Sequence, residues 1–213
     1  MIHSLLESNY KKIEVIVIDD ASPSGIPEEI TSLQNVKVIR NQKEKFVSGS
    51  RNTGIKSAKG DLYFLIDDDN VVEKETISEL INVIHSNSLI GVVCPLNYYL
   101  EDPRRIWWAG TIRNKMTSLT RSIGKDQIDV CQFKTLIRSE SFRNAFMVRK
   151  KVIQDIGLFD EKHFPIHYEE ADFSERIKQI GLKIVVVPTA KIWHNIPRLK
   201  SPRSLHAHTN LRA

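Results

Sequence analysis

The clearest pattern in the chain is a short apolar run that ends in three carboxylates. A Gly-Asp turn signal at 60–61 precedes five apolar or aromatic residues at 62–66, and Asp67, Asp68 and Asp69 follow directly. A continuous apolar run of this length is typical of a strand that is buried on both faces. Because ligands bind outside the carboxyl ends of strands in open parallel sheets, the run predicts a strand that delivers oxygen ligands to a site. A solvated acidic turn is the alternative interpretation.

Apolar runs and helical spacings alternate on both sides of this stretch. The runs predict further strands at 13–18, 36–40, 90–94, 146–148 and 184–187. The spacings and turn signals predict helices at 28–33, 48–58, 77–84, 152–156 and 169–180. This alternation favours an α/β fold with a mainly parallel, Rossmann-like sheet flanked by crossover helices. Pro95 is expected to end the strand at 90–94.

Length and composition indicate an ordinary globular protein. A chain of 213 residues predicts one domain, and the hydrophobic content of 41% and charged content of 27% are ordinary for a globular protein. We find no eighteen-residue apolar window and no basic leader before an apolar core, so we expect neither a transmembrane helix nor a signal peptide. Cys94 and Cys131 give no disulfide framework and no metal-binding spacing. We therefore expect a cytoplasmic protein.

The net charge of +5 is concentrated in two basic regions. One lies at the C-terminus, and the other contains Arg104, Arg105, Arg113, Lys115 and Arg121. Such regions suit phosphate groups, anionic lipid surfaces or nucleic acid, although a solvated basic surface would explain most of these residues singly. No nucleic-acid recognition motif is present, so we expect no nucleic-acid partner. Peripheral contact with the inner face of the cell membrane fits the same charge.

The stretch 97–142 has little regular pattern and contains the aromatic pairs Tyr98-Tyr99 and Trp107-Trp108. One interpretation is that these rings pack an irregular excursion against the core. The other is that they form a wall of an acceptor pocket, because aromatic faces pack well on sugar rings.

A second acidic cluster lies about a hundred residues after the first. Glu169, Glu170 and Asp172 precede an apolar helical face. Acidic residues in a first turn interact favourably with the helix dipole, which could explain them without any site. Three carboxylates over four positions exceed what capping requires, however, and indicate a second group of candidate ligands or bases. His194 ends a later apolar run and is either a structural residue or a ligand.

Several segments together resemble the inverting nucleotide-sugar glycosyltransferases of family 2, which have the GT-A fold. The resemblance is closest to the rhamnosyltransferase-like branch of surface polysaccharide assembly in the cell envelope. It covers most of residues 5–195 in the family's order. The segments that carry it are Glu14-Val-Ile-Val-Ile-Asp-Asp-Ala-Ser22, Ser50-Arg-Asn-Thr-Gly-Ile-Lys-Ser-Ala-Lys-Gly-Asp61, Phe64-Leu-Ile-Asp-Asp-Asp69, Ile156-Gly-Leu-Phe-Asp-Glu161, Glu169-Glu-Ala-Asp172 and Pro188-Thr-Ala-Lys-Ile-Trp-His194.

The resemblance implies a nucleotide-sugar site in one half of the chain, at 1–95. Asp20 is similar to the carboxylate that holds the nucleobase, with Asp19 as a second candidate. Arg51 and Asn52 resemble the pair near the nucleotide phosphates. Asp67, with Asp68 beside it, resembles the sugar-contacting acid of the family's Asp-X-Asp motif. The implied donor is a UDP-, dTDP- or GDP-linked sugar.

The resemblance also implies a divalent cation, Mn²⁺ or Mg²⁺, and an acceptor-binding half at 96–195. Asp69 and Asp67 resemble the metal-binding acids, and His194 matches a histidine that adds a ligand in some members. Glu170 matches the general base, and Glu169 and Asp172 flank it. Such a base would take the proton of a saccharide or lipid-linked saccharide hydroxyl in a single inverting displacement. Residues 196–213 would form a basic tail.

One departure from the family concerns the start of the chain. Relatives begin with another apolar strand, which lies between the strands that end at Asp20 and Asp69, whereas Met1 falls inside the helix that follows it. Without that strand two edges would lose their partners. A truncated, catalytically inactive nucleotide-sugar-binding remnant is therefore the alternative to an active glycosyltransferase. A nucleotidyltransferase is disfavoured because no Gly-rich basic phosphate loop is visible.

Overall fold

The computed structural model describes residues 1–114 and 116–197. Residues 198–213, which make up most of the expected basic tail, and Lys115 lie outside the described residues. The helices are α1 Ile2–Leu6, α2 Glu28–Thr31, α3 Phe46–Ser57, α4 Thr76–Ser86, α5 Lys150–Ile156 and α6 Glu169–Gln179. The strands are β1 Val15–Asp19, β2 Val36–Arg40, β3 Leu62–Ile66, β4 Asn70–Val72, β5 Ile90–Tyr99, β6 Ile106–Trp108, β7 Thr111–Arg113, β8 Thr120–Ser122, β9 Ile137–Ser139, β10 Ala145–Arg149 and β11 Lys183–His194.

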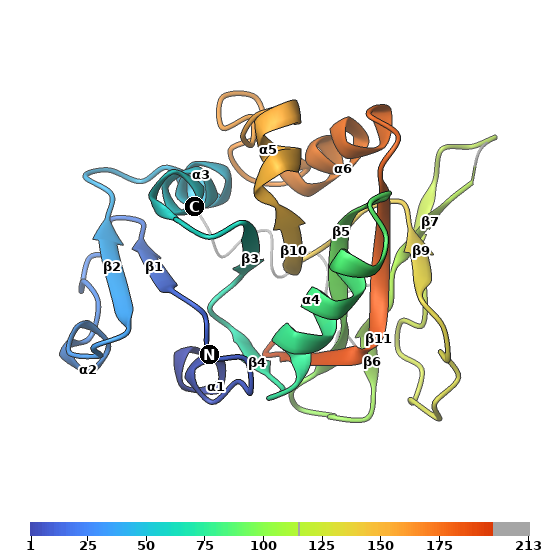
Figure 1. Cartoon of the computed structure of the whole chain (residues 1–213), viewed down its shortest axis with the longest axis horizontal. Coiled ribbons are helices and arrows are strands. Elements are labelled where there is room, and N and C mark those ends of the chain that lie inside the picture. The colour runs from blue at the N-terminus through green and yellow to red at the C-terminus, as the bar shows by residue number, and fades with distance from the viewer. Residues whose placement is uncertain (115, 198–213) are drawn as a thin grey trace.

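A seven-stranded sheet forms the centre of the molecule, with the order β3-β10-β5-β11-β4 and with β6 and β9 paired to β5 and β11 (Figure 1). β5 and β11 are parallel, but β10 runs antiparallel to both β3 and β5. The expected α/β architecture is confirmed, and the expectation of mainly parallel pairing is wrong. The reason is that β10, from the second half of the chain, inserts between two strands of the first half that share one direction.

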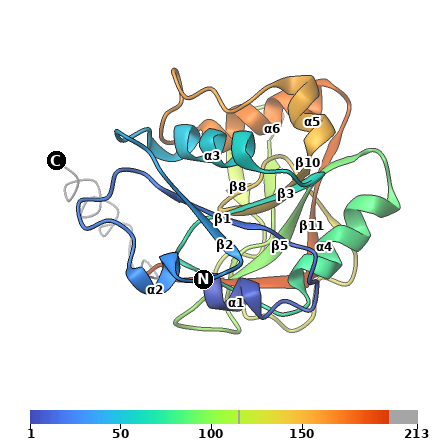
Figure 2. The same cartoon turned by 60° about the vertical axis from the view of Figure 1, so that its left-hand side comes forward.

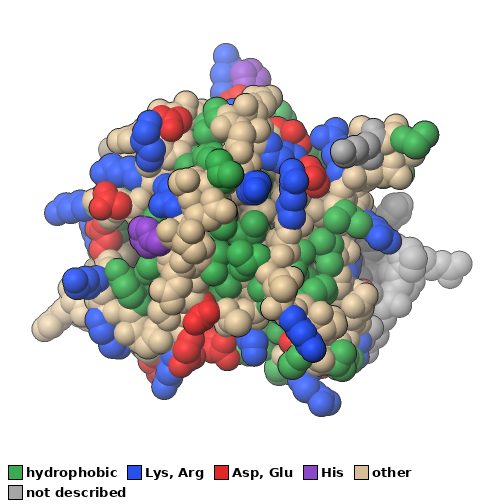
Figure 3. Space-filling view, turned by 45° about the vertical axis from the view of Figure 1, so that its right-hand side comes forward, with side chains coloured by type: hydrophobic (Ala, Val, Ile, Leu, Met, Phe, Trp, Pro, Cys, Tyr) green, Lys and Arg blue, Asp and Glu red, His purple; other side chains and the backbone are tan. Residues whose placement is uncertain are grey.

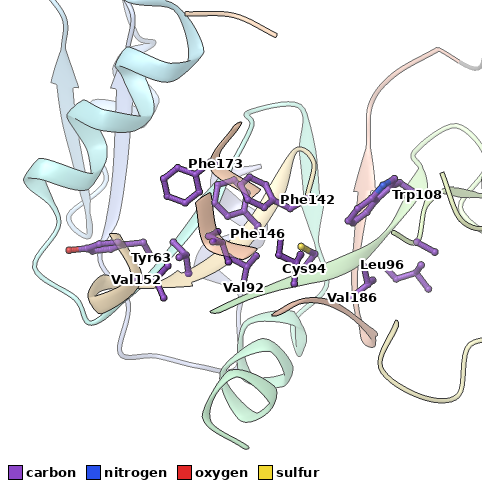
Figure 4. Packing of buried hydrophobic residues seen from close by; sticks show 14 of the residues in the cluster. Tyr63, Val92, Cys94, Leu96, Trp108, Phe142, Phe146, Val152, Phe173 and Val186 are labelled. Atoms are coloured by element: carbon purple, nitrogen blue, oxygen red, sulfur yellow. The ribbon is translucent and has the colours of Figure 1, made fainter. Parts of the chain in front are cut away.

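Helices cover both faces of this sheet, and alternation along each strand supplies both faces with apolar side chains (Figure 2). Neighbours such as Val92 and Val93 belong to different core clusters. One cluster joins the sheet to α3, α5 and α6, and stacks Phe142 on Phe146 with ring centroids 3.9 Å apart (Figure 4). The other joins the sheet to α1 and α4. Two-faced burial explains why these strands appear as continuous apolar runs in the sequence.

A separate two-stranded parallel sheet, β1–β2, lies beside the main one. Among the described strands, β1 pairs only with β2, and β3 pairs only with β10. Three of the five residues of β1 are partly exposed, although the sequence predicts a buried strand. The unpaired edges of β1 and β3 agree with the expectation that a strand of the family is missing between them.

Pro95 does not end its strand, contrary to expectation. β5 continues through it to Tyr99, and the parallel ladder with β11 shifts register between Val187 and Lys191, opposite Pro95. The proline therefore falls where the ladder is interrupted, so its missing N–H costs no regular hydrogen bond. The expected strand at 184–187 and the following apolar run form one strand, β11, and this register shift lies between them.

The excursion at 97–142 is built from short β pairings, and most of its aromatic side chains are core residues. Tyr98, Tyr99 and Trp108 are at most 3% exposed. Packing, not an acceptor wall, therefore accounts for these three rings. None of the described helices is long and apolar enough to cross a membrane.

Candidate functional site

The two acidic clusters converge on one guanidinium group. Nη2 of Arg51, on α3, lies 3.1 Å from Oδ1 of Asp67, directly after β3, and 3.1 Å from Oε1 of Glu170, in the first turn of α6. Its Nη1 lies 3.5 Å from Oε1 of Glu169. Three elements that are distant in sequence thus place a cation among three carboxylates, and the acidic tips predicted from the sequence lie at one site.

Aromatic packing holds Arg51 in place. Its guanidinium carbon lies 5.6 Å from the ring centroids of both Phe146 and Phe159. Burial alone would lower the pKa of Arg51, but the charges of Glu170, Asp67 and Glu169 outweigh burial and raise it. Arg51 is therefore a permanent cation that links the end of β3 to the start of α6.

Burial and neighbouring groups act in opposite directions on the pKa of Glu170. Burial raises the pKa of its carboxyl, although Arg51 and the backbone N–H of Asn144, which donates to Oε1 at 2.8 Å, partly oppose that rise. The helix that carries it begins after His167 and Tyr168, which both have φ of 64°. Two successive non-glycine residues in the left-handed region are strained, and such strain concentrates at functional sites. The turn directs Glu170 toward Arg51.

A second pair lies at the far side of the acidic turn. Asn70 of β4 is registered opposite His194 of β11, which brings Asp69 against the imidazole. Nε2 of His194 is 3.0 Å from Oδ2 of Asp69. The Trp107 ring and the imidazole form a T-shaped pair with centroids 4.6 Å apart, and the histidine is only 7% exposed. The pairing of β4 with β11 thus sets the position of this acid.

The residues present fit a divalent cation at Asp69 and His194. Nε2 of His194 and Oδ2 of Asp69 are within hydrogen-bond distance of each other at 3.0 Å. The same separation would allow both atoms to bind one octahedral cation, because neighbouring ligands at about 2.1 Å from such a cation lie roughly 3.0 Å apart. No group of three or more His, Cys, Asp or Glu side chains within the described ranges is arranged to hold a metal. A cation here would therefore have two protein ligands and take the rest from phosphate oxygens and water, as Mg²⁺ commonly does. Asp67, also predicted as a ligand, pairs with Arg51 instead.

Unpaired buried atoms mark the same site. Among residues 1–114 and 116–197, the buried side-chain polar atoms without a hydrogen-bond partner are Nη1 of Arg51, Oε2 of Glu169 and Nδ1 of His194. Buried polar groups are nearly always satisfied, so each exception requires a reason. All three belong to residues that the sequence predicts to be functional, which is consistent with a ligand completing these bonds.

Asp19 and Asp20 lie at the end of β1, where local contacts occupy both carboxylates. Asp19 is paired with Arg40 and accepts from the N–H of Ser22 at 2.8 Å. Asp20 accepts from the Asn41 amide at 2.7 Å and from the N–H of Lys45 at 3.0 Å. An open depression of about 470 Å³ beside them is lined by Arg40, Asn41, Gln42, Lys43 and Lys45. Its three cations suit an anionic ligand.

Two other predicted residues are occupied by structural contacts. The amide of Asn52 donates to the backbone oxygen of Phe159 at 2.9 Å and to Glu161 at 3.0 Å, which ties α3 to the loop before α6. Asp172 pairs with Arg176, one turn further along α6. Asp68 is exposed at the tip of the turn. Of the predicted residues, Arg51, Asp67, Glu169 and Glu170 form one cluster, and Asp69 and His194 form an adjoining pair.

Sequence reasoning missed three buried asparagines beside the site. Asn70, Asn97 and Asn144 are at most 4% exposed. The only signal in the sequence was their position, at the start or inside apolar runs where an amide must find a buried partner. Asn144 contacts Glu170 through its backbone N–H.

Comparison with known proteins gives a family match over most of the chain. The family model described as "Glycosyl transferase family 2" matches residues 1–153. An uncharacterised glycosyltransferase of Haemophilus influenzae is 31% identical over 93 residues, which cover 44% of this chain and 32% of that protein. A dolichol-phosphate mannosyltransferase of Pyrococcus furiosus is 39% identical over 82 residues, covering 37% and 23%. The chain therefore spans about a third or less of these relatives' length.

Solved structures show the same fold. GalNAc-T7, solved with UDP, GalNAc and Mn²⁺, covers 94% of this chain with a TM-score of 0.76 and 21% identity, and the match covers 40% of that chain. The mannosyltransferase PcManGT of Pyrobaculum calidifontis, solved with GDP-Man and Mn²⁺, covers 93% with a TM-score of 0.66 and 14% identity, and 53% of that chain. These likenesses show the GT-A fold. The matched family model covers more than half of the sequence, and the chain belongs to glycosyl transferase family 2.

Proposed function

We propose that the protein transfers a sugar from a nucleotide-sugar donor to a saccharide or lipid-linked saccharide acceptor, with a divalent cation and inversion of the anomeric centre. The observation that carries the proposal is the convergence of Asp67 and Glu170 on Arg51, beside the Asp69–His194 pair. A transferase of this kind needs acids on two sides of one cleft, one near the diphosphate and one near the acceptor hydroxyl.

Each group has a role that its surroundings support. A cation at Asp69 and His194 would neutralise charge on the departing diphosphate. Asp20 and the basic depression at residues 40–45 would hold the nucleotide end of a UDP-, dTDP- or GDP-linked donor. Glu170 would accept the proton of the acceptor hydroxyl as that oxygen attacks. Its raised pKa improves the match to a hydroxyl proton at neutral pH.

The acceptor side has features that suit a sugar. Tyr168 directly precedes the two glutamates and is 76% exposed, so its ring is free to stack on a pyranose. The excursion at 97–142 carries the exposed cations Arg104, Arg113 and Arg121. On the face turned forward from the side of β7 and β9, hydrophobic side chains gather near the centre, with Lys and Arg at several points around them and a group of Asp and Glu below them (Figure 3). A cytoplasmic enzyme that meets a lipid-linked acceptor at an anionic membrane surface would use such a face.

One observation favours a second candidate, a nucleotide-sugar-binding protein without turnover. One edge of β1 and one edge of β3 are unpaired among the described strands, and β1 ends at Asp19 with Asp20 directly after it. The two-stranded sheet β1–β2 is therefore a thin layer. A donor held by this thin layer would be bound but imperfectly aligned with Glu170, and misalignment of about 1 Å costs on the order of 100-fold in rate.

The test is a thermal-shift screen of UDP-, dTDP- and GDP-linked sugars with and without Mn²⁺. A donor at ten times its Kd should stabilise the chain by about 1.4 kcal/mol, or roughly 3–5 °C in Tm for a protein of this size. Asp69→Asn should abolish the Mn²⁺-dependent part of the shift while the fold stays intact. Asp155→Asn is the matched control, since Asp155 lies in an exposed pair with Lys151 on α5 and should behave like the parent.

Turnover separates the two candidates. Metal-dependent release of nucleoside diphosphate that is lost in Glu170→Gln supports the transferase. Binding that is unchanged in Glu170→Gln, with no release in either protein, supports the binding protein. Equal Mn²⁺-dependent shifts in Asp69→Asn and the parent would show that Asp69 does not bind the cation.

A further inference from the structure

Two buried side-chain amides lie between the acidic turn and the helix that carries Glu170. The amide nitrogen of Asn70 donates to Oδ1 of Asn144 at 2.9 Å, and the amide nitrogen of Asn144 donates back to Oδ1 of Asn70 at 2.8 Å. Such a reciprocal pair uses a donor and an acceptor of both side chains, so neither can turn without breaking both bonds.

Each end of this amide pair contacts one of the acidic clusters. Nδ2 of Asn70 also lies 3.1 Å from Oδ1 of Asp69 and 2.9 Å from the backbone oxygen of Asp67. The backbone N–H of Asn144 donates to Oε1 of Glu170 at 2.8 Å. Hydrogen bonds therefore link the carboxylate of Asp69 to the side chain of Asn144 through Asn70, and the backbone N–H of the same Asn144 reaches the carboxylate of Glu170.

The backbone of Asn144 is in a conformation that serves this contact. Its φ of 58° lies in the left-handed region, which asparagine tolerates better than most residues. Nδ2 of Asn144 has another acceptor, Oδ1 of the fully buried Asn97, at 3.1 Å. The two side-chain anchors hold the strained residue so that its N–H points at Glu170 immediately before β10 begins at Ala145.

We propose that Asn144 is a positioning residue that couples the cation-binding turn to Glu170. It holds the carboxylates of Asp69 and Glu170 at a fixed separation. Binding of a cation at the acidic turn therefore affects the position of Glu170. The inference rests on the proposed function, because it assigns the cation to Asp69 and His194. Asn144 itself acts only through Asn70 and through its own backbone.

The experiment follows Mg²⁺ alone by backbone amide NMR on the full chain, with Asn144→Gly as the test variant. Glycine adopts positive φ freely and keeps the N–H that contacts Glu170, so the substitution removes only the amide bridge. In the parent, Mg²⁺ should shift the amides of both Asp69 and Asn144. In the variant, the amide at position 144 should no longer respond, and Mg²⁺ affinity should fall about 10-fold, as for other residues that support a metal ligand.

Two further variants keep the result interpretable. Ser139→Ala removes a buried hydroxyl that bonds the N–H of Thr111 and lies off the path, so its Mg²⁺ response should match the parent. Asn97→Ala removes the acceptor of the second hydrogen bond of the Asn144 side chain. It should lower Mg²⁺ affinity about 3-fold and weaken the Mg²⁺-dependent shift of the amide at position 144. This second variant decides the matter if Asn144→Gly does not fold.

The outcomes are distinct. A parent in which Mg²⁺ shifts Asp69 but not Asn144 would overturn the coupling and leave the cation site in place. So would Asn144→Gly or Asn97→Ala with the parent's affinity and the parent's response at position 144. A parent with no Mg²⁺ response at Asp69 or His194 would overturn the cation site of the proposed function and the coupling together.

Discussion

The two sheets of this protein bury their strands to very different degrees. All ten residues of β5, at the centre of the seven-stranded sheet, are buried, and helices cover that sheet on both faces. In β1, three of five residues are partly exposed, and its only partner among the described strands is β2. The sequence of β1 is no less apolar than that of the central strands, so the difference lies in what each strand packs against.

This difference divides the candidate site. Asp19 and Asp20, expected at the nucleobase, depend on local contacts with Arg40, Asn41 and Lys45 in the thin layer. The Arg51 cluster and the Asp69–His194 pair depend on elements from across the chain that the main sheet brings together. We infer that the part of the site around Arg51, Asp69 and His194 is rigid. The part at Asp19 and Asp20, proposed above to hold the nucleotide, is the more easily deformed.

The largest effect is expected from Arg51→Met, which tests the rigid end. Loss of the guanidinium leaves Asp67, Glu169 and Glu170 close together without a cation. Breaking a buried ion pair by removing one partner typically costs about 3–5 kcal/mol, so the free energy of unfolding in urea should fall by that amount.

Arg113→Met provides the matched control, because Arg113 pairs with Glu175 at the surface and both side chains are more than 40% exposed. Such a pair contributes about 1 kcal/mol or less. Equal losses in the two variants would mean that Arg51 is no more important to the fold than a surface charge.

A pair of isoleucine substitutions compares the two sheets directly. Ile184 of β11 is 1% exposed and should cost about 2–5 kcal/mol when changed to alanine. Ile16 of β1 is partly exposed, so Ile16→Ala should cost only about 1 kcal/mol. Urea unfolding of both variants measures the difference. If the two losses were the same, β1 would be as well packed as the main sheet and the proposed division of the site would not hold.

Sequence alone predicted what local pattern determines. The apolar run at 62–66 became β3, and the acids after it reached a shared site with Glu170 because strand ends and helix starts gather at one edge of an α/β sheet. Helical spacing at Ile77, Leu80 and Ile84 gave α4 with those side chains buried.

The sequence pattern did not predict how elements that are distant in the chain are placed in the sheet. The residues of β10 do not indicate that this strand inserts antiparallel between β3 and β5, because a short apolar run pairs equally well in either direction. The roles of Arg51 as the hub of three carboxylates and of Asn70 and Asn144 as a linked pair arise only once that insertion brings the two halves together.

A smaller effect concerns the pH dependence of Glu170. Burial raises the pKa of its carboxyl, and Arg51 opposes that rise. Because the native state then holds the proton more tightly than the unfolded chain, this group should favour folding as pH falls through its raised pKa toward about 4.3. The carboxyl ¹³C resonance of Glu170 should titrate above the ordinary range. Arg51→Met removes the opposing cation, so in a folded sample of this variant the titration should move further upward. Arg51→Lys keeps a cation at the position and is the control, in which the titration should move little. An ordinary titration in the parent would contradict the effect of burial on the Glu170 carboxyl.

The smallest expected effect has the opposite sign and belongs to the thin layer. Hydrogen bonding from Ser22, together with the charge of Arg40, lowers the pKa of Asp19. Its contribution to stability is complete above the ordinary value of about 3.9 and is lost as pH falls through the lowered native value. Hydrogen exchange at pH 5, 4 and 3 should show β1–β2 opening more readily in acid while β5 stays protected, and Asp19→Asn should remove that trend. Parallel loss of protection in both sheets would show instead that they open as one cooperative unit, in which case the deformable nucleotide end inferred above does not exist as a separate element.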